Sequence, residues 1–209
     1  MYRLIKKSFY ERPALVVAKD LIGCRLSFED PKHGPVGGIV VETEAYTTGD
    51  AACHAWHLEQ KRKKNPQATG RGAELFGEPG LTYVYLNYGM YWLLNVVTDP
   101  LGVPGGVLIR AVEPTIGESI VWKNRPNISK REQLTNGPGK LTLGIGITGH
   151  HHQLDVTRGP IYFEKPLKKI SSLEIATSSR IGITQATDLE WRFYLRGNSY
   201  VSPAKPSSR

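Results

Sequence analysis

Apolar residues along the chain fall in short runs that glycine, proline and charged residues interrupt, a pattern that favours strands. One helix is expected over residues 13–22, because Pro13 suits a first helical turn and Gly23 ends the apolar run. A second helix is expected over residues 118–123. Strands are expected over residues 24–28, 38–46, 82–86, 91–97, 107–112, 161–163 and 191–195.

The segments between these elements indicate one domain rather than several. Residues 47–80 are rich in glycine and charged residues, which predicts a long functional loop with one short helix. Residues 136–139 are typical of a turn, and an apolar stretch follows over residues 141–147. Because no internal repeat or clear linker is found, we expect a single α+β domain over residues 1–201 and a disordered tail over residues 202–209.

The charge of the chain gives a first indication of its partners. Among 209 residues, 27 Lys and Arg stand against 19 Asp and Glu, a formal net charge of +8, and the pI is about 9.5. This balance is typical of proteins that bind nucleic acids. Solvated basic loops, other polyanions and membrane surfaces are consistent with the same charge, so these alternatives stay open.

Several protein classes do not fit the sequence. Two cysteines, Cys24 and Cys53, are too few for a disulfide framework and lack the spacing of zinc ligands. No apolar run approaches the roughly 18 residues of a membrane span. Residues 1–7 lack the apolar core of a secretory signal. We therefore expect a reduced, cytoplasmic protein without a membrane partner.

One face of the strand expected over residues 38–46 could carry chemistry. Strand alternation places Val40, Glu42, Glu44 and Tyr46 on the same face. Two carboxylates and a phenol there are either an ordinary solvent-facing surface or part of a functional site. The strand alone favours the solvent-facing interpretation, so the choice depends on a partner elsewhere in the chain.

Arg110 is the candidate partner, because it is the only charged residue in the apolar strand over residues 107–112. A buried guanidinium needs a carboxylate beside it. Arg110 therefore either orients a catalytic carboxylate or its water, or it reaches solvent at a sheet edge.

Tyrosines gather in the hairpin expected over residues 82–97. Turn residues occupy positions 87–90, which places Tyr88 at the tip of the hairpin. An aromatic side chain at an exposed tip has no core to fill, so Tyr88 is a candidate binding residue. We interpret Tyr83 and Tyr91 as strand packing, which is the more common role of tyrosine in strands.

An aromatic wedge is suited to an enzyme that takes a base out of a duplex. Extrusion costs a few kcal/mol, and a side chain must fill the gap that the base leaves. Stacking of the extruded base on an aromatic ring returns about 1–3 kcal/mol.

Asn95, a polar residue in the apolar return strand, needs hydrogen-bond partners if it is buried.

Several motifs carry a resemblance that covers nearly the whole chain. They are residues 41–46 (Val-Glu-Thr-Glu-Ala-Tyr), 83–91, Asn95, 107–114 and 136–141, flanked by residues 18–23 and 192–197. In these motifs and their order, the chain resembles the alkyladenine (3-methyladenine) DNA glycosylase family. The resemblance implies a curved antiparallel β-sheet with peripheral helices and a protruding β-hairpin, and no helix-hairpin-helix motif.

The same resemblance implies roles for individual residues. Glu44 would be the general base that activates water, and Arg110 would hold that water together with a main-chain carbonyl near Ile183. Tyr88 would intercalate into the DNA. The base-binding pocket would be formed by Tyr46, His54, Tyr85 and Asn95, and Lys140 would contact the DNA backbone.

The implied activity is hydrolysis of the N-glycosidic bond of alkylated purines that are flipped out of double-stranded DNA. An alkylated purine is cationic, so it leaves without much acid help, and tyrosine faces attract it. Asn95 would crowd the 2-amino group of guanine and so favour lesions of the 3-methyladenine type. We expect a monofunctional, monomeric enzyme without a cofactor or metal, and surface positions for residues 150–152. Residues 61–71 depart from the family pattern.

Two other functions stay open. A non-catalytic binder of damaged or bent nucleic acid would use the same charge and the same tip, Tyr88. A glycoside hydrolase would use Glu42 and Glu44, because side chains two apart on a strand lie about 6–7 Å apart at the backbone. The basic charge does not suit a neutral sugar polymer.

Overall fold

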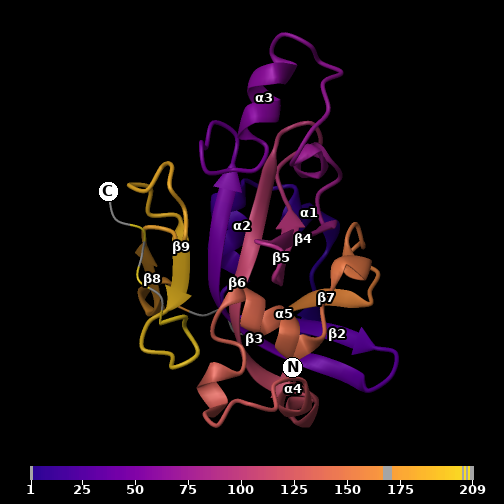
Figure 1. Cartoon of the computed structure of the whole chain (residues 1–209), viewed down its shortest axis with the longest axis vertical. Coiled ribbons are helices and arrows are strands. Elements are labelled where there is room, and N and C mark those ends of the chain that lie inside the picture. The colour runs from indigo at the N-terminus through magenta and orange to yellow at the C-terminus, as the bar shows by residue number, and fades with distance from the viewer. Residues whose placement is uncertain (1, 167–170, 204, 206, 208–209) are drawn as a thin grey trace.

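Antiparallel strands build the central sheet of the computed structural model, which describes residues 2–166, 171–203, 205 and 207 (Figure 1). The strand order is β1-β7-β2-β3-β6-β5-β4, and β9 pairs with β3 and β8. The expected α+β class with an antiparallel sheet is confirmed. The strands are β1 (Tyr2–Leu4), β2 (Arg25–Asp30), β3 (Gly34–Thr47), β4 (Thr82–Asn87), β5 (Tyr91–Val97), β6 (Gly105–Ile116), β7 (Ile161–Pro166), β8 (Ile175–Ser178) and β9 (Arg192–Leu195).

Short helices surround this sheet, and both helices expected from the sequence are present as α2 and α4. Residues 136–139, expected as a turn, lead instead into a helix, α5. Pro138 occupies its first turn, where the N–H that proline lacks has no helical partner in any case. The α-helices are α1 (Lys7–Tyr10), α2 (Ala14–Leu21), α3 (Trp56–Arg62), α4 (Glu118–Asn124) and α5 (Pro138–Ile145).

Strand β3 changes neighbours along its length, and this change positions the acidic residues. On one side β3 pairs with β6. On the other side it pairs with β2 as far as Ile39 and with β9 from Glu42 to Glu44. Both glutamates are therefore flanked by strands on each side, and neither exposes any surface to solvent.

The alternation of β3 is broken near Glu42. The register between β3 and β6 shifts on both sides of this residue. Val40 consequently packs in the same apolar cluster as Ala45, whereas Val41 packs with Tyr200 in a separate cluster. The expected common face of Val40 and Glu42 is therefore wrong, because strict alternation does not survive an irregular register.

The segment between β3 and β4 packs on the hairpin that β4 and β5 form. It contains α3, the short helix expected there, and a 3-10 helix, η1 (Ala73–Phe76). An apolar cluster joins the segment to the two strands and is separate from the main core around α2 and α5. Its buried members are Cys53, Ala55, Leu58, Leu75, Phe76, Tyr83 and Val97.

Two of the described residues near the C-terminus form hydrogen bonds with the rest of the chain. Ser202, which the sequence analysis assigns to a disordered tail, is buried and donates its backbone N–H to Glu42. Ser207 accepts a hydrogen bond from the N–H of Ile183. The remaining part of the expected tail at residues 204, 206, 208 and 209 lies outside the described residues. Among the helices that the structure describes, none has the length and apolar character needed to cross a membrane.

Candidate active site

A cleft of about 900 Å³ opens beside the β4–β5 hairpin. Strand β6, the end of β3, the segment between β3 and β4, the beginning of α5 and residues 181–185 complete its walls. The structure brings together in these walls six of the side chains to which the sequence analysis gives a role in the site: Tyr46, His54, Tyr85, Tyr88, Asn95 and Arg110. Tyr83 and Tyr91, interpreted as strand packing, also line the cleft. Glu44 lies directly behind the wall, and Lys140 lies outside it.

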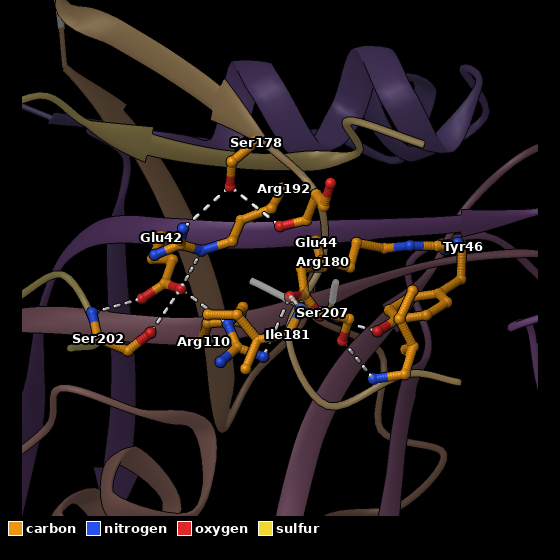
Figure 2. A network of polar contacts seen from close by, with 12 residues as sticks. Glu42, Glu44, Tyr46, Arg110, Ser178, Arg180, Ile181, Arg192, Ser202 and Ser207 are labelled. Atoms are coloured by element: carbon orange, nitrogen blue, oxygen red, sulfur yellow. Dashed lines mark hydrogen bonds and ion pairs between the residues drawn. The ribbon is translucent and has the colours of Figure 1, made fainter. Parts of the chain in front are cut away.

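The carboxylate of Glu44 is fully buried and receives contacts from three elements (Figure 2). The hydroxyl of Tyr46 donates to Oε2 at 2.8 Å, and the backbone N–H of Ile181 donates to Oε1 at 2.7 Å. Nη1 of Arg110 lies 3.2 Å from the same Oε1. All three donor residues line the cleft, so the base expected at position 44 is held by the wall itself.

Arg110 bridges two carboxylates. Its Nε donates to Oε1 of Glu42 at 2.8 Å, while Nη1 faces Glu44. Burial acts to lower the pKa of Arg110, but the charges of Glu44 and Glu42 outweigh it and raise this pKa above its ordinary value. The partner that the sequence predicts for a buried guanidinium is therefore a pair of glutamates, and Arg110 does not reach solvent at a sheet edge.

A second buried ion pair supports the wall from behind Tyr46. The guanidinium of Arg180 donates to Asp50, with Nη2 at 2.9 Å from Oδ1, and to the carbonyl of Ala45 at 3.0 Å. The same guanidinium lies 4.6 Å from the ring centroid of Tyr46. Burial, followed by the charge of Glu44, raises the pKa of Tyr46 well above its ordinary value, so its hydroxyl stays protonated and remains a donor.

His54 is the centre of an aromatic group in the cleft. Its ring lies 4.5 Å from that of Tyr85, and its Nδ1 lies 3.0 Å from the hydroxyl of Tyr83. Nη2 of Arg71 donates to Nε2 at 2.7 Å, which requires a neutral ring with its proton on Nδ1. Burial and the charge of Arg71 lower the pKa of His54 to about 4, in agreement with that tautomer.

Asn95 lies in the cleft wall, and Tyr88 lies at the tip of the β4–β5 hairpin. Asn95 is buried, and its Nδ2 donates to the carbonyl of Tyr83 at 3.1 Å while the residue lines the cleft. Tyr88 is 83% exposed at the tip of the hairpin. Its φ of 50° is a left-handed conformation that bulky residues rarely adopt, and such strain is typical of functional positions.

Residues 150–152 and Lys140 lie outside the cleft. Residue 150 is exposed and residues 151 and 152 are half-buried, and Nδ1 of His152 accepts the backbone N–H of Val84, which holds this loop on β4. Lys140 donates to Oδ1 of Asn136 at 2.9 Å, and burial followed by the charge of Arg125 lowers its pKa. Within the part of the chain that the structure describes, no three His, Cys, Asp or Glu side chains gather as metal ligands would.

Sequence reasoning missed the residues that support the site from a distance. Arg71 falls in the segment that departs from the family pattern, and Asp50 lies 130 positions from Arg180. Arg192 and Ser202 reach Glu42 from the far end of the chain. A single sequence carries no local signal for such pairs, apart from the charged residue inside an otherwise apolar strand that identified Arg110.

Comparison with known proteins identifies the family of this chain. The family model for methylpurine-DNA glycosylase (MPG) matches residues 8–199. A protein of Salinibacter ruber named "Putative 3-methyladenine DNA glycosylase" is 47% identical over 201 residues, which cover 96% of this chain and 97% of that protein. A protein of the same name from Carboxydothermus hydrogenoformans is 42% identical over 199 residues, covering 95% and 98% of the two chains. The chain belongs to the methylpurine-DNA glycosylase family.

Proposed function

We propose that the protein removes alkylated purines of the 3-methyladenine type from duplex DNA by hydrolysing the N-glycosidic bond. The observation that carries this proposal is the buried carboxylate of Glu44, paired with Arg110 directly behind a cleft lined by tyrosines. The names of the relatives and the net charge of +8 support a DNA substrate.

Base extrusion is the first step of the proposed reaction. Tyr88 enters the duplex from the exposed tip of the hairpin and fills the space that the damaged nucleotide leaves. The extruded base enters the cleft and stacks against Tyr46, Tyr85 and His54. Because His54 is neutral, a cationic purine meets electron-rich rings there rather than a positive imidazolium.

Hydrolysis then needs one water and one base. The water oxygen attacks C1′ of the deoxyribose, its proton passes to the carboxylate of Glu44, and the electron pair of the broken bond leaves with the purine. The cationic purine departs as a neutral base. Glu44 also stabilises the positive charge that develops on the sugar, and Arg110 with a carbonyl near Ile183 positions the water.

The geometry of Glu42 disfavours a glycoside hydrolase. That reaction needs a second carboxylate free to act as acid or base. Oε1 of Glu42 accepts from Arg110, Arg192 and the hydroxyl of Ser202, and Oε2 accepts the backbone N–H of Ser202. Of the partners of Glu42 only Arg110 lines the cleft, whereas all three donor residues of Glu44 do, which leaves Glu44 as the single proposed base.

A product assay tests the proposal. Duplex DNA carrying radiolabelled methyl groups is incubated with excess protein, and the released bases are separated and identified. The wild-type protein should release 3-methyladenine, and Glu44→Gln should release none while it still binds the methylated DNA. Glu164→Gln, a change in the remote pair between Arg25 and Glu164, should release bases as the wild type does.

Two results would contradict the proposal. Full activity of Glu44→Gln would remove Glu44 from the role of base. A wild-type protein that binds methylated DNA but releases no base would favour the alternative of a non-catalytic binder.

A further inference from the structure

Glu42 is a buried charge that the proposed reaction does not use. It exposes no surface and does not line the cleft. Four donors satisfy it, from Arg110 at 2.8 Å, Arg192 at 2.7 Å, and the hydroxyl and N–H of Ser202 at 2.8 and 2.7 Å. Burial of a carboxylate costs several kcal/mol unless its partners compensate. A role for Glu42 would explain why a charged residue occupies this buried position.

The position of Arg110 indicates this role. Figure 2 shows its guanidinium between the carboxylates of Glu42 and Glu44. The guanidinium group is planar and rigid, so fixing its Nε edge also fixes the direction of Nη1. The hydrogen bond from Nε to Glu42 therefore determines where Nη1 meets Glu44.

Arg192 supplies a second positive charge beside the two carboxylates of Glu42 and Glu44. It crosses from β9, where it stands opposite Glu44 in the register, and its Nε donates to Glu42. Nη1 of Arg192 donates to the hydroxyl of Ser178 at 3.0 Å, and its guanidinium lies 4.5 Å from the ring centroid of Tyr194. Two carboxylates and two guanidinium groups thus share one buried site.

We propose that Glu42 is a positioning residue, which with Arg192 aims Arg110 at Glu44 and limits how much of the positive charge of Arg110 acts on Glu44. This inference rests on the proposed role of Glu44 as base. Without Glu42, Arg110 pairs with Glu44 alone. Without Arg192, Glu42 draws Arg110 away from Glu44.

Opposite effects of the two changes on the pH dependence follow from the charges. Glu44 interacts with Tyr46 from β3, Tyr85 from β4, Arg110 from β6 and Arg180 from the segment after β8. Glu42 and Arg192 are its neighbours along β3 and across to β9. Removing a negative neighbour favours the carboxylate form of a glutamate, and removing a positive neighbour favours its protonated form.

Base release under single-turnover conditions across pH tests the proposal. Glu42→Gln should move the acid limb of the profile to lower pH by about 1 unit, and Arg192→Gln should move it to higher pH. The plateau rate should fall about 10- to 100-fold in both, because Arg110 is no longer held in place. The double variant should return the acid limb to its wild-type position, and its rate should stay low. Glu164→Gln is the matched control and should keep the wild-type profile.

The outcomes separate a positioning role from a structural one. If both single variants fold and lose activity without any movement of the acid limb, Glu42 only supports the fold and the proposal is overturned. If the single variants do not fold, the double variant decides, because it keeps the charge balance: a wild-type rate in it would overturn the proposal. Base release by Glu44→Gln, or none by the wild type, would instead count against the proposed function.

Discussion

The hydroxyl of Tyr46 lies 2.8 Å from Oε2 of Glu44, so one side chain both holds the buried carboxylate and forms part of the cleft wall. The two roles can be separated by removing the hydroxyl alone. Tyr46→Phe keeps the ring and should bind methylated DNA as the wild type does. Its rate of base release should fall about 10- to 100-fold, since a hydrogen bond to a charged group is worth about 1.5–3 kcal/mol. Single-turnover assays and filter binding measure the two quantities, and an unchanged rate would exclude a role for this contact.

Tyr88 should matter for DNA and not for the fold. Its side chain is 83% exposed, so Tyr88→Ala should change the free energy of unfolding by no more than about 0.5 kcal/mol. Extrusion of the damaged base should weaken, which a fluorescent base analogue at the lesion reports directly. A fall of many degrees in the melting temperature would mean that Tyr88 is structural.

The pair between Asp50 and Arg180 should be a large contributor to stability. Both side chains are fully buried, so Asp50→Asn leaves the charge of Arg180 without its counter-ion and should cost about 3–5 kcal/mol. Urea denaturation measures this loss. Glu164→Gln, in a pair whose side chains are 28% and 15% exposed, should cost clearly less, and equal losses would contradict this ranking.

His54 should make the stability depend on pH in a defined window. Its pKa is lowered to about 4 in the folded protein, whereas the unfolded chain binds the same proton near pH 6.5. The unfolded state therefore gains a proton first, and stability should fall as the pH drops from about 6.5 to about 4. The loss attributable to His54 is on the order of 3 kcal/mol. His54→Gln should show a shallower slope across this window in denaturant titrations, and a slope equal to that of the wild type would contradict the assignment.

Local patterns predict those parts of the fold that local forces determine. Turn residues at positions 87–90 place Tyr88 at a hairpin tip, and the structure has this hairpin as β4 and β5. The lone charge in an apolar strand identifies Arg110 as a residue that needs a carboxylate, and it has two. In both cases the sequence signal lies within a few residues of the side chain concerned.

Other features depend on contacts that no local pattern contains. Strict alternation places Val40 with Glu42, but the irregular register with β6 separates them. Similarly, Asn136 to Gly139 has the composition of a turn, although its second half forms the first turn of α5 against β5 and β6. Tertiary packing decides between the alternatives that composition leaves open.

The buried carboxylates take their partners from distant parts of the chain. Ile181 lies 137 positions from Glu44, and Ser202 lies 160 positions from Glu42. The entropy of closing such long loops must be overcome before these contacts contribute any stability. Catalytic competence should therefore be a late property of the refolding chain, so that recovery of base release marks the completion of folding, whereas recovery of helical and strand signals marks only its onset.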